Sequence, residues 1–235
     1  MKLNRTRLTL IMLTVIVAGL LTLGARTASA LLITLDTGSS AISGCCTGPY
    51  VNVTVTLNNS TSASVIFQSL TNGGNLYRLT DGSSAALNVN ASSFSVSSIT
   101  GSSSAPGFTP GPFTLANPPG TSNVNGFGRF NLVIDSFDSF SHSSDQLTFN
   151  ITNLSGTWAS ESNILTANSN GALAAAHIGA CAASCTDFSF GGFAAGNNST
   201  VPPIETPEPS TLVLLGAGLL ALCALARRQT PERSK

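Results

Sequence analysis

The first candidate for hydrolytic chemistry in this chain is an Asp-Thr-Gly-Ser sequence. Asp36, Thr37, Gly38 and Ser39 match the loop that carries one of two catalytic carboxylates in acid-catalysed peptide hydrolysis. That chemistry needs a second aspartate, because the two carboxylates share one proton about 3 Å apart. Asp135-Ser136-Phe137 and Asp138-Ser139-Phe140 lack the glycine of a second such loop. We therefore interpret residues 36–40 as a turn.

Histidines and acidic side chains offer two weaker possibilities. His142 and His177 are the only histidines, and no Gly-x-Ser-x-Gly sequence supplies a serine nucleophile. Asp135, Asp138 and Asp145 carry the oxygen ligands that calcium prefers, but their spacing matches no standard calcium loop. A solvated acidic turn is the preferred interpretation. We predict no enzymatic activity, no bound metal and no cofactor.

Cysteine is the remaining residue type with distinctive chemistry. Four of the five cysteines lie in the central part of the chain: Cys45, Cys46, Cys181 and Cys185. In an oxidising compartment these four are expected to form disulfides, and the sequence leaves all three pairings open. The alternative is a zinc site formed by His177, the last two of these cysteines and one of the first two. That site would require the segment around His177 to be helical.

Charge is concentrated at the two ends of the chain. Only 9% of the 235 residues are charged, and the overall formal charge is zero. Residues 31–206 contain two arginines, Arg78 and Arg129, and eight acidic residues, which leaves a formal charge of −6. This central part has no lysine and cannot form the basic groove that a phosphate backbone requires. Nucleic-acid binding is therefore excluded from the expected functions.

The amino-terminal segment has the order of a secretory signal. Lys2, Arg5 and Arg7 precede an apolar run over residues 8–23, and Ala28-Ser29-Ala30 follows it. Small residues at positions 28 and 30 suit the binding pocket of signal peptidase. We predict that residues 1–30 are a signal peptide cleaved after Ala30.

The carboxyl-terminal segment has the order of a membrane anchor. Residues 201–210 are rich in proline and form an extended linker that contains Pro207, Glu208 and Pro209. Residues 211–226 carry no charge, and Arg227 and Arg228 follow directly. We predict a short transmembrane helix over residues 211–228, in which the two arginines act as a stop on the cytoplasmic side of the inner membrane. Residues 229–235 form the cytoplasmic tail.

The tripartite carboxyl terminus resembles the PEP-CTERM sorting signal. Pro207-Glu208-Pro209, the apolar helix and the arginine pair occur in the order of that family. The resemblance implies that an exosortase, an integral-membrane sorting protease, recognises the tail and removes it near the motif. It also implies an inner-membrane precursor, a final place at the cell surface or outside the cell, and a host that makes exopolysaccharide.

The central part is more loosely similar to the bodies of PEP-CTERM proteins. The similarity rests on residues 126–135, 147–152 and 174–178. Those bodies have no assigned activity, so this similarity implies no catalytic role.

Apolar and polar residues alternate with period two along several central segments. Val51, Val53 and Val55 alternate with polar neighbours, and so do Leu147, Phe149 and Ile151. Phe130, Leu132 and Ile134 alternate with Asn131, Val133 and Asp135. Leu87 and Val89 alternate with Asn88 and Asn90, and Phe94 and Val96 follow. Weaker patterns cover residues 31–35, 65–70, 76–80 and 172–181. Short alternating strands and polar turns predict an all-β domain over residues 31–200, of antiparallel sandwich or jelly-roll type. Residues 101–126 are expected to form a long loop or a crossover with few strands.

These features favour a non-enzymatic surface or matrix protein that associates with exopolysaccharide. The first alternative is a carbohydrate-binding module, for which Trp158, Tyr50 and Tyr77 are the only Trp and Tyr side chains that could stack on sugar rings. A secreted hydrolase that uses Asp36 is the second alternative.

Overall fold

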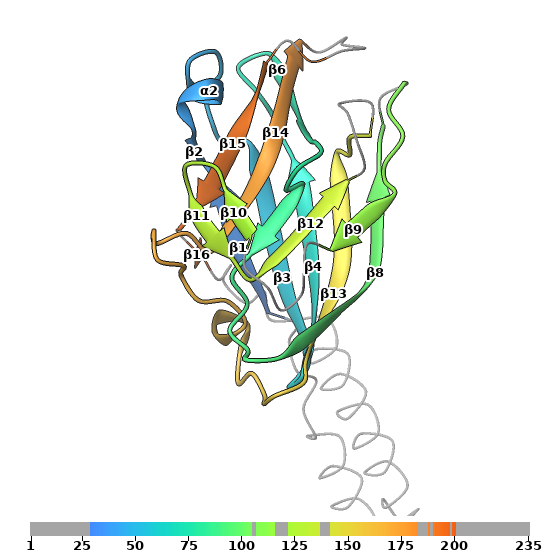
Figure 1. Cartoon of the computed structure of the whole chain (residues 1–235), viewed down its shortest axis with the longest axis vertical. Coiled ribbons are helices and arrows are strands. Elements are labelled where there is room, and N and C mark those ends of the chain that lie inside the picture. The colour runs from blue at the N-terminus through green and yellow to red at the C-terminus, as the bar shows by residue number, and fades with distance from the viewer. Residues whose placement is uncertain are drawn as a thin grey trace, which may run out of the picture. The chain divides into compact units, whose positions relative to one another are not determined.

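The computed structural model describes residues 29–104, 107–115, 122–136, 142–182, 188, 190–197 and 199–200 (Figure 1). Antiparallel strands form most of this part of the chain, and its helices are one turn at α2 (Ser40–Ser43) and a 3₁₀ turn at Glu161–Asn163. The predicted all-β fold is confirmed at this level. Within these described residues, no helix has the length and apolar character that a bilayer crossing requires. The expected signal peptide and membrane helix lie outside them, except for residues 29 and 30.

The first sheet has six strands in the order β16-β1-β3-β4-β13-β8. Their bounds are β16 (Ser199–Thr200), β1 (Ala30–Leu35), β3 (Val51–Asn59), β4 (Ser62–Ser69), β13 (Gln146–Asn153) and β8 (Phe94–Ser102). Alternation explains the burial of this sheet, because Val51, Val53 and Val55 are fully buried while Asn52 and Thr54 are half-buried. The strands expected around Val53 and Phe149 are thus confirmed.

The second sheet has the main strand order β2-β15-β14-β7-β12-β9. Two further strands extend it, since β6 pairs with β14 and β5 pairs with β6. The bounds are β2 (Thr37–Gly38), β15 (Phe190–Gly196), β14 (Ala174–Ala182), β7 (Ala85–Leu87), β12 (Leu132–Ser136), β9 (Phe113–Leu115), β6 (Asn75–Leu79) and β5 (Thr71–Asn72).

The two sheets share one hydrophobic core. Ile33, Val53, Phe67 and Phe149 come from the six-stranded sheet, and Leu79, Leu87, Ile134 and Ile178 come from the other sheet. Burial of these side chains, at about 25 cal/mol per Å² of apolar surface, is the main force that holds the layers together.

A hairpin covers part of the outer face of the eight-stranded sheet. It consists of β10 (Ser122–Val124) and β11 (Gly128–Phe130), and Figure 1 shows it in front of β14 and β15. Val124 and Phe130 are fully buried against Val133, Ala175 and Ala195, which form a second, smaller apolar cluster. The outer face of this sheet is therefore divided into a covered part and an uncovered part.

The prediction that Phe130 shares one face with Leu132 and Ile134 is wrong. The strand is interrupted at Asn131, so Phe130 belongs to the outer cluster while Leu132 and Ile134 lie in the main core. The Asn131 side chain accepts a hydrogen bond from the Val89 N–H (2.7 Å) and donates one to the Val89 carbonyl (2.8 Å). This side-chain pairing replaces regular strand structure and reverses the orientation of Phe130.

Some strands gave no alternating signal. β15 has the sequence Phe-Gly-Gly-Phe-Ala-Ala-Gly, in which glycines hide the period. The expected long loop over residues 101–126 contains the end of β8 and also β9 and β10, so that expectation is wrong in part.

The two ends of the described domain lie next to each other. β1 and β16 are antiparallel, with Leu32 opposite Thr200 and Ile33 opposite Ser199. Ala30, the residue before the expected signal cleavage, is itself in β1 and lies opposite Thr56 of β3. Ala30 and Thr200 therefore lie at the same end of the same pair of strands.

Candidate functional site

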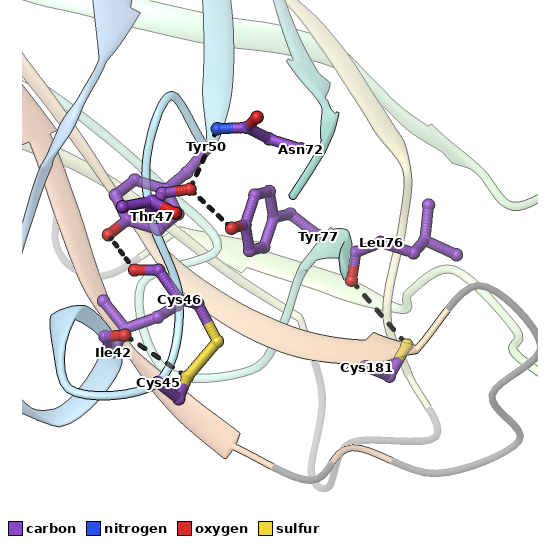
Figure 2. The surroundings of a disulfide bond; sticks show 9 residues. All are labelled: Ile42, Cys45, Cys46, Thr47, Tyr50, Asn72, Leu76, Tyr77 and Cys181. Carbon is purple, nitrogen blue, oxygen red and sulfur yellow. Dashed lines mark hydrogen bonds between the residues drawn. A yellow bond between two sulfur atoms is a disulfide. The ribbon is translucent and has the colours of Figure 1, made fainter. Parts of the chain in front are cut away.

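The structure selects one of the cysteine pairings that the sequence left open. Cys45 and Cys46 form a disulfide between consecutive residues, with their Cα atoms 3.7 Å apart (Figure 2). Cys181, near the end of β14, is also disulfide-bonded. Cys185 lies outside the described residues. The sulfurs of Cys45, Cys46 and Cys181 are therefore not available as thiolates.

The zinc site is contradicted on two grounds. His177 and Cys181 lie on a strand and not on a helix, and four residues of strand separate their Cα atoms by about 13 Å. The sulfurs of three of the four candidate cysteines are bonded in disulfides. Among the described residues, no three His, Cys, Asp or Glu side chains gather as metal ligands would.

Two buried tyrosines support the loop that follows the disulfide. Tyr50 Oη donates to the Cys46 carbonyl (2.9 Å), and Tyr77 Oη donates to the Thr47 carbonyl (2.6 Å). The two rings meet edge to face with centroids 4.9 Å apart, as Figure 2 shows. Burial raises the pKa of both phenols. Tyr50 and Tyr77 therefore stabilise the loop and present no open ring face to a sugar.

Trp158 is also unsuited to the stacking role expected of it. Its side chain is buried, at 2% exposure, and its indole N–H donates to the Asn90 carbonyl (2.9 Å). It contributes to the wall of an open hollow of about 450 Å³ that also includes Asn153 and Asn163. A ring with so little exposed surface cannot serve as a sugar platform.

The Asp-Thr-Gly-Ser sequence does not assemble a carboxylate pair with Asp135. Asp36 is exposed, and its carboxylate accepts a hydrogen bond from Thr37 Oγ1 (3.1 Å). Asp135 lies on β12, four strands from β2 in the sheet order, which corresponds to about 19 Å. Its carboxylate accepts a hydrogen bond from the Ser83 N–H instead. Asp138 lies outside the described residues.

Asp135 and Asp145, two of the three carboxylates considered as calcium ligands, form hydrogen bonds with different loops. Asp145 accepts hydrogen bonds from the backbone and side chain of Ser104 and from Ser102 Oγ, whereas Asp135 contacts Ser83. Burial alone would raise the pKa of Asp145. The Ser104 hydrogen bonds, the charge of Arg78 and the Ser102 hydrogen bond outweigh it and lower that pKa.

Arg78 is the fully buried cation of the domain. Its guanidinium donates to Ser143 Oγ from Nε (2.9 Å), to the Ser143 carbonyl and to Ser103 Oγ, and it lies 4.4 Å from the centroid of the Phe108 ring. Nη1 is buried and has no hydrogen-bond partner among the described residues. Burial lowers the pKa of Arg78, while Asp145 opposes this effect. These contacts join β6 to two loops and give Arg78 a structural role.

An open groove lies on the outer face of the eight-stranded sheet. Residues 38–41, 125–127, 177 and 191–193 line it, and its volume is about 410 Å³. We call it the Phe193 groove. The His177 and Phe193 rings stack at its base with centroids 4.4 Å apart and planes inclined by 19°. His177 Nδ1 also contacts the Asp81 carbonyl, which fixes the ring.

Hydrogen bonds and close packing hold the groove in shape. The Ser39 N–H donates to the Phe193 carbonyl (2.7 Å), and the Phe193 N–H donates to Ser39 Oγ (3.0 Å). Gly192 allows α2 to approach, since a Cβ there would lie 2.9 Å from the Ile42 nitrogen. At the hairpin turn, Gly126 has a φ of +86°, which places Phe127 at the groove.

Phe127 connects the groove to a second hollow. The second hollow has a volume of about 170 Å³, and its lining includes Phe127, Thr37, Asn170 and Asn197. Sequence patterns did not identify Phe127 or Phe193 as site residues, because they come from a turn and a glycine-rich strand, and Ser39 was considered only as part of the Asp-Thr-Gly-Ser sequence. The Phe-Gly-Gly-Phe sequence at residues 190–193 was the available signal for a backbone surface open to a ligand.

Comparison with known proteins places the recognisable motif at the end of the chain, outside the described residues. Residues 205–229 match the family model of the PEP-CTERM protein-sorting motif. This range includes Pro207-Glu208-Pro209 and the Arg227-Arg228 pair. No curated protein and no solved structure matches the chain. The chain therefore carries a PEP-CTERM protein-sorting motif, as an exported substrate of exosortase does.

Proposed function

We propose that the protein is a non-enzymatic component of the cell surface or extracellular matrix and associates there with exopolysaccharide. The observation that carries this proposal is the sorting motif at residues 205–229, next to a domain of polar, antiparallel strands. The motif implies export and a precursor that is anchored in the membrane before cleavage. Release to the surface, and association with polymer, are the further steps that we propose.

The positions of the chain ends suit display from a membrane. Leu32 lies opposite Thr200, so an amino-terminal anchor and a carboxyl-terminal anchor would leave the domain at one point. The far end of β1, at Leu35, lies about 17 Å from Ala30. A domain attached in this way presents its opposite end and its outer faces to the surroundings.

The placement of the carboxylates supports a non-enzymatic role. Asp36, Asp135 and Asp145 each bind a separate local partner, and the first two are far apart. A hydrolase that uses Asp36 remains the alternative to test. We expect Asp36→Asn to leave every function of the protein unchanged, and loss of a hydrolytic activity in this variant would contradict the proposal.

A carbohydrate-binding module is the second candidate function, and the Phe193 groove is the observation that favours it. The groove combines half-buried aromatic rings with exposed hydroxyl and amide groups. Phe127 and Phe193 replace Trp158, Tyr50 and Tyr77 as the aromatic residues of this candidate, because the latter three are buried.

The test of sorting is intact-mass and cell-fractionation analysis in the native host. Wild type is expected to be trimmed after Ala30 and near Pro209 and to appear outside the inner membrane. A variant with Ala at positions 207, 208 and 209 should remain uncut at the carboxyl terminus and stay in that membrane. Replacement of Pro202 and Pro203 by Ala is the matched control, since these prolines lie outside the motif. Identical trimming of all three proteins would overturn the proposal.

A further inference from the structure

We propose that the Phe193 groove binds a neutral polysaccharide segment. This inference rests on the proposed function, because it assigns the polymer contact to one site on the domain. The groove has a volume of about 410 Å³, within the range of about 300–1,000 Å³ that small-molecule sites occupy.

The aromatic rings of the groove supply the apolar contact that a sugar needs. Phe127 and Phe193 are both half-buried and line the same groove from a hairpin turn and from β15. The C–H groups on one face of a pyranose ring are apolar, and they pack well on the face of an aromatic ring. His177 stacks on Phe193, so this ring is held in a fixed orientation before a ligand arrives.

Hydroxyl and amide groups surround the rings. Ser40 and Asn125 are exposed at the groove, and Thr37, Asn170 and Asn197 surround the adjoining hollow. Such groups both donate and accept hydrogen bonds, as sugar hydroxyls do. Gly191 also lines the groove and is half-buried, and because it has no side chain a ligand can approach the strand backbone closely there.

Charge determines which class of polysaccharide fits. The residues that line the groove and the adjoining hollow include no Lys, Arg, Asp or Glu. The central part of the chain carries a formal charge of −6, which would repel a polymer of uronic acids. A neutral glycan avoids that repulsion and needs no basic partner.

The position of the groove suits a long ligand. Phe127 lies between the groove and the second hollow, so the two together offer consecutive contacts along one surface. Residues 38–41 come soon after Leu35, the end of β1 that lies about 17 Å from Ala30. A polymer can therefore reach the groove while the domain is still attached at its chain ends.

The test is binding of the full-length protein, in detergent, to an array of neutral and uronic-acid oligosaccharides. We expect wild type to bind neutral members, and Phe127→Ala and Phe193→Ala to weaken that binding about tenfold or more, because each removes an aromatic contact. Phe190→Ala is the matched control: Phe190 lies on the same strand, is 53% exposed and does not line the groove. Circular dichroism melting of each variant should show that the domain remains folded.

Three results would overturn the inference. They are no binding of wild type to any neutral glycan, preferential binding of uronic-acid members, and equal loss of binding in Phe127→Ala and Phe190→Ala. Fractionation of Phe127→Ala separates the groove from the sorting proposal. We expect Phe127→Ala to lose glycan binding but to be trimmed and exported normally. If the Pro207-Glu208-Pro209 test shows no sorting, that result contradicts the sorting proposal and leaves the groove proposal unaffected.

Discussion

Leu32 and Thr200 lie opposite each other on two antiparallel strands, although one is near the start of the domain and the other is at its end. The beginning and the end of the described domain are therefore neighbours in one sheet. Ala30 precedes Leu32 in the same strand and is paired with Thr56. The peptide bond after Ala30, where we expect signal cleavage, therefore lies within a sheet of the folded domain.

The first prediction is that signal cleavage precedes folding of β1. A protease needs an extended and accessible substrate, and access to Ala30 in the folded domain requires local unfolding. We expect purified signal peptidase to leave the folded full-length protein uncut. Val53→Asp, which places an unpaired carboxylate in the core beside β1, should unfold the domain and allow cleavage. Mass spectrometry of the amino terminus measures this, and Leu154→Ala, at an exposed site, is the control. Equal cleavage of wild type and Val53→Asp would contradict the prediction.

The second prediction concerns the side chain that interrupts the strand at Asn131. Asn131→Ala removes both hydrogen bonds to the buried Val89 and should lower the free energy of unfolding by about 1–3 kcal/mol. Urea unfolding followed by tryptophan fluorescence measures the change. Asn123→Ala, at an exposed position on the adjacent hairpin, should have an effect within about 0.5 kcal/mol of zero. Similar effects of the two substitutions would show that the Asn131 contact contributes nothing.

The third prediction is an acid-dependent loss of stability through Asp145. The pKa of Asp145 in the folded domain lies below its ordinary value of 3.8, so the folded state favours the ionised form. This contribution is fully present above pH 3.8 and is lost as the pH falls through the lower, folded-state pKa. Asp145→Asn should therefore lower the melting temperature at neutral pH. The difference in melting temperature between this variant and wild type should shrink as the pH falls below 3.8.

Thermal melts at a series of pH values measure this difference. Asp36→Asn is the control, because Asp36 is exposed and binds its neighbour Thr37. A difference between wild type and Asp145→Asn that stays constant from neutral pH into strong acid would rule out the proposed ionised state.

The fourth prediction is that the Cys45–Cys46 disulfide adds little stability. The bond joins consecutive residues, so it closes no loop of chain and restricts the unfolded state very little. Replacement of both cysteines by Ala should change the free energy of unfolding by less than about 1 kcal/mol. Tyr50→Phe, which removes the hydrogen bond to the Cys46 carbonyl, should cost about 1 kcal/mol. A much larger loss in the cysteine variant than in Tyr50→Phe would contradict this.

Sequence patterns predicted the six-stranded sheet better than its partner. β3 and β13 each have one buried face and one more exposed face, so apolar and polar residues alternate along their sequences with the period of a strand. Parts of both faces of β15 are covered by other elements, and the strand has glycines where those elements approach. Its sequence therefore shows no alternation of apolar and polar residues. The interruption at Asn131 depends on contacts with Val89, which is distant in the sequence and invisible to local periodicity.

The candidate site was harder to predict for a related physical reason. Trp158, Tyr50 and Tyr77 were considered as rings that could stack on sugars, yet all three are buried and the polar atom of each has an internal hydrogen-bond partner. Phe127 and Phe193, which have no polar atoms, remain half-exposed because the turn and the glycine-rich strand around them offer no cover. Which aromatic rings are buried and which stay half-exposed thus depends on the tertiary fold and not on the residue type.

The pairing of β1 with β16 also makes the domain suitable for circular permutation. Leu32 and Thr200 are directly opposite each other, about 5 Å apart at Cα, so a short connection could join the two ends of the domain. New ends could then be opened at the exposed turn of Gly73 and Gly74 between β5 and β6. Such a circular permutant would keep every strand pairing described here, and its two targeting segments would emerge from a different part of the domain.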